Sequence, residues 1–99
     1  MSGLREEILA RLAENRAVLR RMGVRRLGLF GSAARGDRAD PGDLDFLVEL
    51  DTKTFDAYMD LKAFLEQLFN RPVDLVLVDA LKPALREGIL EEAVYAPGL

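Results

Sequence analysis

The chemistry that this sequence can perform is indicated by a glycine–serine pair followed, ten residues later, by two aspartates. The pair is Gly31-Ser32, and the aspartates are Asp43 and Asp45 in the segment DLDFLVEL. That segment alternates polar and apolar residues, which predicts a strand. Alternate residues of a strand share a face, so the two carboxylates project together from Cα atoms roughly 6.5–7 Å apart. Carboxylates this close repel each other unless a cation lies between them, which indicates a shared site for a divalent ion.

Asp74 is the candidate for a third carboxylate. It interrupts the apolar run VDLVLV at residues 73–78, which is typical of a central strand. Val73 and Leu75 share one face, and Asp74 lies on the other, where an unpaired acid is costly. If this strand lies beside the strand of Asp43 and Asp45, the three carboxylates converge. Such a set can hold two Mg²⁺ or Mn²⁺ ions about 3.5–4 Å apart and accept a proton from an attacking hydroxyl. The alternative is a salt bridge at a strand start.

The glycine–serine pair is expected to hold a phosphate group. Gly31 allows the backbone to approach the phosphate closely, and Ser32 is expected to cap a short following helix. Unoccupied backbone N–H groups at the start of that helix would point at the anion. Arg35, one helical turn later, is expected to neutralise phosphate charge; the alternative is a solvated surface arginine.

Composition excludes several classes of enzyme. The 99 residues contain no histidine and no cysteine. This removes triad catalysis by serine or cysteine with histidine, thiolate zinc sites and disulfides. A metal must therefore be a hard ion held by oxygen, such as Mg²⁺. The net charge of −3 argues against nucleic acid as the direct substrate. No signal-peptide core or membrane-spanning run is visible, so we expect a cytoplasmic protein that binds no membrane.

The elements that must position these residues form an α/β (α+β) pattern. Helices are predicted at 3–22, 32–35, 54–69 and 83–95, and strands at 24–30, 43–50 and 73–78. Residues 36–42 are expected to form a loop. The five phenylalanines fall on apolar faces and are assigned to the core, so no adenine-contacting residue is identified. We therefore expect a single domain over residues 1–99, with a small mixed sheet of three to four strands packed against helices.

The segment LFGSAARGDRADPGDLDFLVEL resembles the G-S-x₉₋₁₃-D-x-D signature of the DNA polymerase β-like nucleotidyltransferase superfamily. The chain is most similar to the minimal nucleotidyltransferase (MNT) branch of that superfamily, and the resemblance extends through VDLVLVDAL to the closing GILEEAVYA. It implies the polymerase β palm-like fold. It also implies that Asp43, Asp45 and Asp74 bind metal and catalyse the reaction, while Gly31 and Ser32 hold the nucleotide triphosphate.

The resemblance also implies a partner. MNT proteins are typically antitoxins paired with a HEPN-family toxin, and members of the family add AMP from ATP to a tyrosine of that toxin. Three functions stay open at this point. The chain either modifies its partner, neutralises it by contact alone, or acts on a small molecule, in the last case as a homo-oligomer. Self-modification at Tyr58 or Tyr95 is a variant of the third, although the helical spacing of Tyr58 favours a core position.

Overall fold

A four-stranded mixed sheet forms the centre of the structure, which is a computed structural model describing residues 3–36 and 42–99. Strands β1 (Val24–Phe30), β2 (Leu44–Leu50), β3 (Val73–Leu77) and β4 (Val94–Tyr95) are arranged in the order β3-β2-β1-β4. Strand β2 is antiparallel to β1 and parallel to β3, while β4 is antiparallel to β1. The predicted mixed sheet covered by helices is confirmed.

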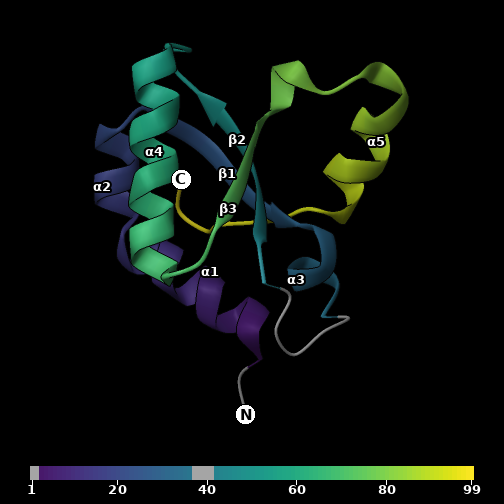
Figure 1. Cartoon of the computed structure of the whole chain (residues 1–99), viewed down its shortest axis with the longest axis horizontal. Helices are drawn as coiled ribbons and strands as arrows, with labels where there is room; N and C mark the ends of the chain where they lie inside the picture. Colours follow the sequence, from purple (N-terminus) through teal and green to yellow (C-terminus); the bar gives the residue numbers. More distant parts are fainter. Residues whose placement is uncertain (1–2, 37–41) are drawn as a thin grey trace.

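Five α-helices and one 3₁₀-helix accompany the described strands. They are α1 (Leu4–Glu14), α2 (Arg16–Arg21), α3 (Gly31–Arg35), α4 (Phe55–Phe69), η1 (Val78–Ala80) and α5 (Pro83–Glu92). Figure 1 shows α2 and α4 at one side of the sheet, with α1 below them, and α5 standing apart at the other side. No helix in the described ranges is long and apolar enough to cross a membrane.

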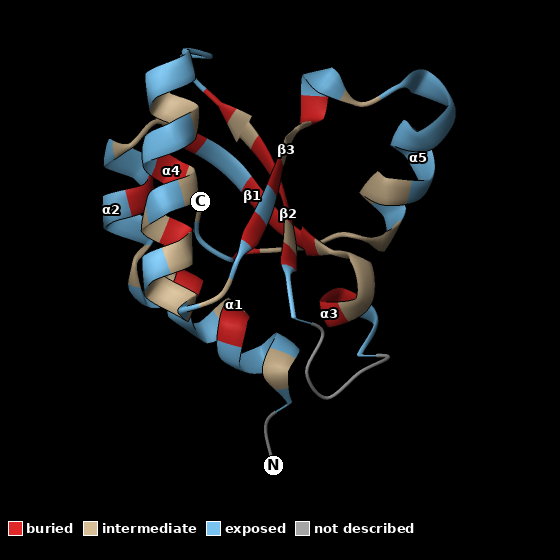
Figure 2. Ribbon diagram, in the orientation of Figure 1, coloured by how far each residue is buried: buried red, intermediate tan, exposed pale blue. Residues whose placement is uncertain are grey.

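Strand β2 is the most buried element, because it has a neighbouring strand on each edge and is covered on both faces. Its predicted inward residues, Leu44, Phe46, Val48 and Leu50, are all buried. Leu47, which alternates to the face of the acids, is buried as well. Figure 2 shows this concentration of buried positions on β1 and β2. A strand held in this way gives its end, where Asp45 lies, a fixed position.

The predicted helix over residues 3–22 is in fact two helices, α1 and α2, separated at Asn15. The side chain of Asn15 donates a hydrogen bond to the Arg11 carbonyl at 2.8 Å, and its backbone N–H is shared between the Arg11 and Leu12 carbonyls. This local bonding competes with the regular helical pattern. Met22 and Gly23 then end α2, and Gly23 has the positive φ expected of a helix stop. Ser2, whose residue type favours helix capping, lies outside the described residues.

The predicted C-terminal helix over 83–95 ends earlier, at Glu92. Ala93 is extended, and Val94 and Tyr95 form β4. The backbone N–H of Ala96 donates to the Leu27 carbonyl on β1 at 2.8 Å. β-Branched and aromatic residues favour a strand when a sheet edge is available. Likewise β3 ends at Leu77, one residue before the predicted end at 78. The other helix boundaries are close to the prediction, and the Thr54 side chain caps α4 by accepting a hydrogen bond from the Ala57 N–H at 3.1 Å.

Replacing Phe46 by Ala is expected to destabilise the fold by about 3–5 kcal/mol. Phe46 is fully buried and its ring stacks on that of Phe69 at a centroid distance of 5.8 Å. The loss is large against the roughly 5–15 kcal/mol typical of a domain. Urea unfolding measures the change. The matched control is Phe55→Ala, since Phe55 is 77% exposed, contrary to its predicted core position. Equal effects of the two substitutions would contradict this account of the core.

Candidate functional site

Asp45 and Asp74 lie directly opposite each other on neighbouring strands. The parallel register of β2 and β3 pairs Leu44 with Val73 and Asp45 with Asp74. Neighbouring strands are about 4.8 Å apart, so the two carboxylates start from adjacent Cα atoms on one face. Asp45 is half-buried and Asp74 is exposed, while Val73 and Leu75 on either side of Asp74 are buried. The two strands are therefore neighbours, which is the condition on which the assignment of Asp74 as a third carboxylate depended.

Asp43, unlike Asp45 and Asp74, does not lie on a strand of the sheet. It precedes the first residue of β2 in a bend and is exposed. Its charge acts on Asp45, but among residues 3–36 and 42–99 no three acidic side chains converge closely enough to form a metal-binding group. The expected convergence of three carboxylates is thus found for two of them. Like charges repel one another, which favours separated side chains.

Gly31 lies against Asp45 at the end of β1. The antiparallel register pairs Phe30 with Asp45, and Gly31 follows with a φ of 74°. A Cβ atom on Gly31 would overlap Oδ2 of Asp45 and lie 3.1 Å from its Cγ. Glycine is therefore required both by the backbone conformation and by the closeness of the carboxylate. The close approach that the structure shows is to Asp45, while the predicted approach of the Gly31 backbone to a phosphate stays a prediction.

Helix α3 places the remaining predicted residues beside the acids. It begins at Gly31, with Phe30 in the capping position, so Ser32 lies inside the first turn and forms no side-chain cap. This corrects the expected capping role of Ser32. The side chain of Ser32 is half-buried, and that of Arg35 is about half exposed. Arg35 acts electrostatically on Asp45 and so stands within reach of the acids.

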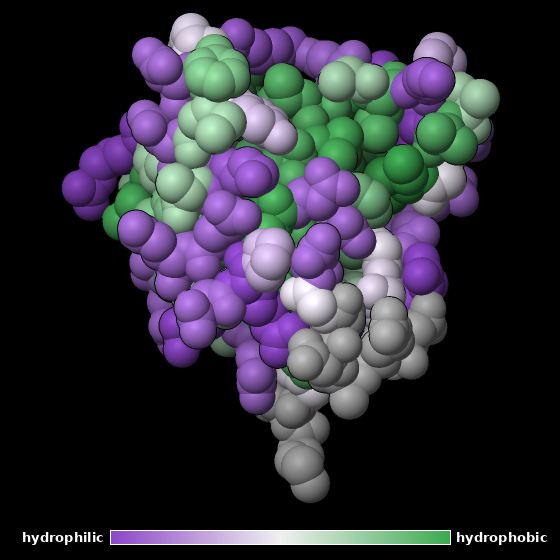
Figure 3. Space-filling model, in the orientation of Figure 1, coloured by the Kyte–Doolittle hydropathy of each residue, from purple (hydrophilic) through white to green (hydrophobic). Residues whose placement is uncertain are grey.

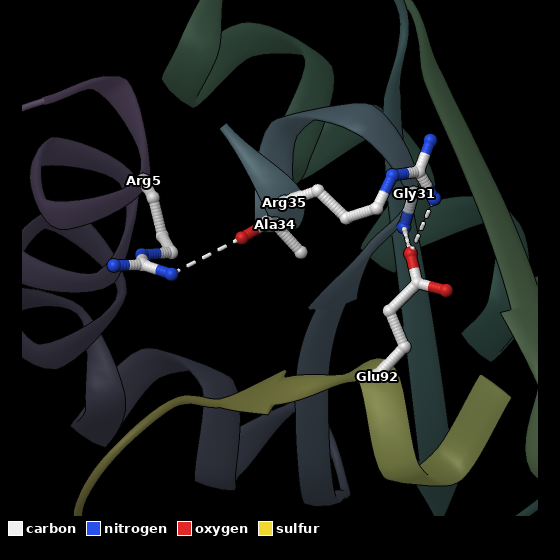
Figure 4. A network of polar contacts seen from close by, with 5 residues as sticks. All are labelled: Arg5, Gly31, Ala34, Arg35 and Glu92. Atoms are coloured by element: carbon white, nitrogen blue, oxygen red, sulfur yellow. Dashed lines mark hydrogen bonds and ion pairs between the residues drawn. The ribbon is translucent and has the colours of Figure 1, made fainter. Parts of the chain in front are cut away.

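Glu92 is the residue that the sequence analysis did not assign. Its Oε1 atom accepts a hydrogen bond from the Gly31 backbone N–H at 3.0 Å and a second from Arg35 Nη1 at 2.7 Å. Figure 4 shows this carboxylate reaching from the end of α5 to both donors. The Gly31 N–H, expected to be unoccupied, is therefore bonded. The only signal in the sequence was the closing GILEEAVYA, to which no role was given.

Burial and the neighbouring acids raise the pKa of the Asp45 carboxyl. Burial is the largest cause, followed by the negative charges of Asp74 and Asp43; Glu92 adds to the effect, and Arg35 opposes it. The site therefore holds excess negative charge at the point where Asp45 is least solvated. A hard divalent cation bound by carboxylate oxygens removes that repulsion, so the donor set fits Mg²⁺ or Mn²⁺. Asp45 and Asp74, with Asp43 at the edge, are the residues that would hold it.

The raised pKa of Asp45 predicts a pH-dependent effect of Asp45→Asn on stability. A group whose pKa is higher in the folded than in the unfolded state stabilises the fold below the unfolded pKa, and this contribution is lost as the pH rises through the folded pKa. Wild type should therefore lose stability relative to Asp45→Asn over the pH range from about 4, the ordinary pKa of an aspartate, up through the raised pKa of Asp45 in the folded protein. Melting temperatures of both proteins without divalent ions measure the difference, which should widen with pH. A difference that is constant across this range would contradict the assigned cause.

Comparison with known proteins adds to this geometry. Residues 9–96 match the family model described as a nucleotidyltransferase domain. The protein adenylyltransferase MntA of Thermococcus cleftensis is 37% identical over 92 residues, which cover 91% of this chain and 93% of the relative. A solved structure assigned as a minimal nucleotidyltransferase is 37% identical, with a TM-score of 0.78 and coverage of 91% of this chain and 93% of that one.

A more distant solved structure shares the fold. It is the tri-AMPylated HEPN toxin of Shewanella oneidensis in complex with an MNT antitoxin. The matching chain is 24% identical with a TM-score of 0.60, and the match covers 89% of this chain and 71% of that one. At this identity the likeness concerns the fold alone, in which the same arrangement of strands and helices recurs.

Proposed function

Because the chain belongs to the nucleotidyltransferase domain family, we propose that it transfers AMP from Mg²⁺–ATP to a hydroxyl group of another protein. The acceptor that we propose is a tyrosine of a HEPN-family toxin, which makes this chain the antitoxin of a cytoplasmic toxin–antitoxin pair. The observation that carries the proposal is the direct pairing of Asp45 with Asp74, with Gly31 packed against Asp45. The 37% identity to an archaeal protein adenylyltransferase supports a protein acceptor.

In the proposed reaction the acceptor oxygen attacks the α-phosphorus of ATP. A bond forms between that oxygen and phosphorus, the bond from the α-phosphorus to the oxygen bridging to the β-phosphorus breaks, and pyrophosphate leaves. The hydroxyl proton passes to a carboxylate, for which Asp74 is the candidate because it is exposed beside Asp45. Asp43, Asp45 and Asp74 would hold divalent cations, whose charge would neutralise the triphosphate and the leaving group.

The proposed nucleotide contacts lie on α3. The turn at Gly31 brings backbone close to Asp45, so a triphosphate bound beside the acids lies next to the first turn of α3. We assign the Ser32 hydroxyl to a hydrogen bond with a phosphate oxygen and the Arg35 guanidinium to its charge. Both residues lie on the same short helix as Gly31, and a hydroxyl and a guanidinium are groups that bind phosphate oxygens.

Exposed apolar surface supports an acceptor on another chain. Figure 3 shows hydrophobic side chains gathered between α4 and α5. Leu85 on α5 is 58% exposed, Met59 on α4 is 41% exposed, and α5 has no buried residue. Apolar patches of this kind commonly mark protein interaction sites. Self-modification is less well supported, because the Tyr58 hydroxyl already donates to the Leu75 carbonyl at 2.6 Å.

The test is incubation of the purified protein with α-³²P-labelled ATP, Mg²⁺ and the protein encoded by the adjacent gene. Label on that protein, with a mass increase of one AMP located on a tyrosine, is the expected result. Absence of label on the neighbouring protein, while the chain is folded and binds ATP, would overturn the proposal. Label on a small molecule alone would favour the small-molecule alternative.

Neutralisation by contact alone is the second candidate, and the exposed apolar surface between α4 and α5 favours it. The double substitution Asp43→Asn with Asp45→Asn distinguishes the two candidates in cells that express the toxin. Survival equal to that with wild type would show that contact suffices. Loss of survival, with the complex still formed, would show that transfer is required.

A further inference from the structure

Glu92 connects α5 to the part of α3 that lies against the acids. Its Oε1 atom accepts hydrogen bonds from both the Gly31 N–H and Arg35 Nη1. The first donor belongs to the residue that touches Asp45, and the second to the arginine that acts on the charge of Asp45. A single carboxylate oxygen therefore contacts both the backbone beside Asp45 and the Arg35 side chain.

The position of Glu92 is itself fixed by the sheet. Glu92 is the last residue of α5, and β4 begins two residues later, with Val94 paired to Leu29 and Tyr95 paired to Gly28 on β1. The ring of Tyr95 lies over Gly28, where a Cβ atom would be only 3.0 Å from it. This pairing anchors the chain next to Glu92, so its carboxylate is presented by a held backbone rather than by a free helix end.

Stability alone gives a poor reason for an acid at this position. A negative charge in the last turn of a helix is unfavourable with respect to the helix dipole. Glu92 also adds negative charge near Asp45, whose pKa it helps to raise. Its ion pair with Arg35 is partly exposed, and such pairs contribute little to folding. A role of the carboxylate at the site gives a reason for an acid at this position that folding stability does not give.

The opposite end of α3 is held independently. Arg5 on α1 donates to the Ala34 carbonyl at 3.2 Å, as Figure 4 shows on the other side of the helix from Glu92. A helix of five residues has few internal hydrogen bonds to hold it, so these two external contacts add to the packing of the buried Ala33 and Ala34. Of the two, the contact of Glu92 is the one adjacent to the acids.

We propose that Glu92 is a positioning residue of the nucleotidyl-transfer site, which holds the Gly31 backbone and Arg35 in the geometry that accepts the triphosphate. This inference rests on the proposed function and deepens it. Glu92 touches neither the acceptor nor the reacting phosphorus in this role; it acts through Gly31 and Arg35. Misplacement of a binding group by about 1 Å can lower a rate about 100-fold, so loss of this contact should be visible in turnover.

The test compares Glu92→Ala, Glu92→Gln and the control Glu91→Ala. Glu91 is the adjacent, exposed acid on α5. Glu92→Ala should lower kcat for AMP transfer about 10- to 100-fold, with a melting temperature close to that of Glu91→Ala. Glu92→Gln keeps an oxygen that accepts both hydrogen bonds and should restore kcat to within about fivefold of wild type. Wild-type kcat in Glu92→Ala, or failure of Gln to restore any activity, would overturn the inference.

A second readout does not depend on the reaction. Amide hydrogen exchange, followed by NMR, should show the Gly31 N–H protected in wild type, Glu92→Gln and Glu91→Ala, and exchanging faster in Glu92→Ala. If wild type transfers no AMP to any protein, the proposed function fails, whereas this exchange pattern still tests the contact. Equal Gly31 exchange in Glu92→Ala and wild type would refute the positioning role even if transfer occurs.

Discussion

Asp45→Asn is expected to lower AMP transfer at least about 1000-fold, equivalent to about 4 kcal/mol of lost transition-state stabilisation, while raising the melting temperature of the metal-free protein by a few degrees. Activity falls because the amide is neutral and binds a divalent cation far less well than a carboxylate. Stability rises because the substitution removes a half-buried charge that burial and the neighbouring Asp74 and Asp43 disfavour. Steady-state transfer rates and thermal unfolding of the same preparations measure the two effects.

The matched control is Glu49→Gln. Glu49 lies on the same strand and the same face of β2 as Asp45 but four residues away, where it forms an ion pair with Arg26 at 4.0 Å. This substitution removes an equal charge from β2 and should leave transfer within about twofold of wild type, since exposed ion pairs contribute little. Similar losses of activity in the two variants, or a lower melting temperature in Asp45→Asn than in wild type, would contradict the assigned role of Asp45.

Gly31→Ala is expected to lower AMP transfer about 100-fold and to destabilise the fold by about 1–3 kcal/mol. The loss of stability comes from a non-glycine residue at a φ of 74°. The loss of activity comes from the new Cβ atom, which would overlap Oδ2 of Asp45 and approach its Cγ. The carboxylate must rotate away, and the metal-binding geometry changes with it. Transfer rates measure the loss of activity, and urea unfolding measures the loss of stability.

Gly23→Ala is the control that isolates the loss of stability caused by a non-glycine residue at positive φ. Gly23 lies at the other end of β1 with a φ of 87°, and a Cβ atom there would meet only Asp51 at an ordinary 3.9 Å. It should therefore lose about as much stability as Gly31→Ala, roughly 1–3 kcal/mol, and keep its transfer activity. Equal activities in the two variants would show that the contact between Gly31 and Asp45 has no part in the reaction.

Three of the four strands could be predicted from local pattern, whereas the adjacency of the acids depended on an assumed pairing of two of them. The apolar run around Asp74 and the alternation around Asp45 each predicted a strand, and β3 indeed lies beside β2 in register. The split of the first helix at Asn15 was missed because a single side-chain hydrogen bond to Arg11 decided it. The strand β4 was missed because its two residues are extended only when the edge of β1 is there to pair with them.

Residues of the site could be predicted where only one residue type fits the position. Gly31 carried a signal because its backbone conformation and its contact with Asp45 both require glycine. Glu92 carried no such signal beyond its place in the closing GILEEAVYA, since it is 47 residues from Asp45 in sequence and resembles Glu91 beside it. The Glu92 carboxylate reaches α3 only in the folded chain, where β4 is paired with β1. A contact between residues so far apart in the sequence is determined by tertiary packing, so the spacing of residue types along the chain does not predict it.

The most direct test of the central claim is a crystal structure with Mn²⁺ and a non-hydrolysable ATP analogue, in which anomalous scattering locates the metal. The claim predicts a Mn²⁺ peak within about 2.3 Å of carboxylate oxygens of Asp45 and Asp74, with the triphosphate against the turn at Gly31 and Ser32. A nucleotide bound elsewhere, or Mn²⁺ held by neither aspartate, would contradict it.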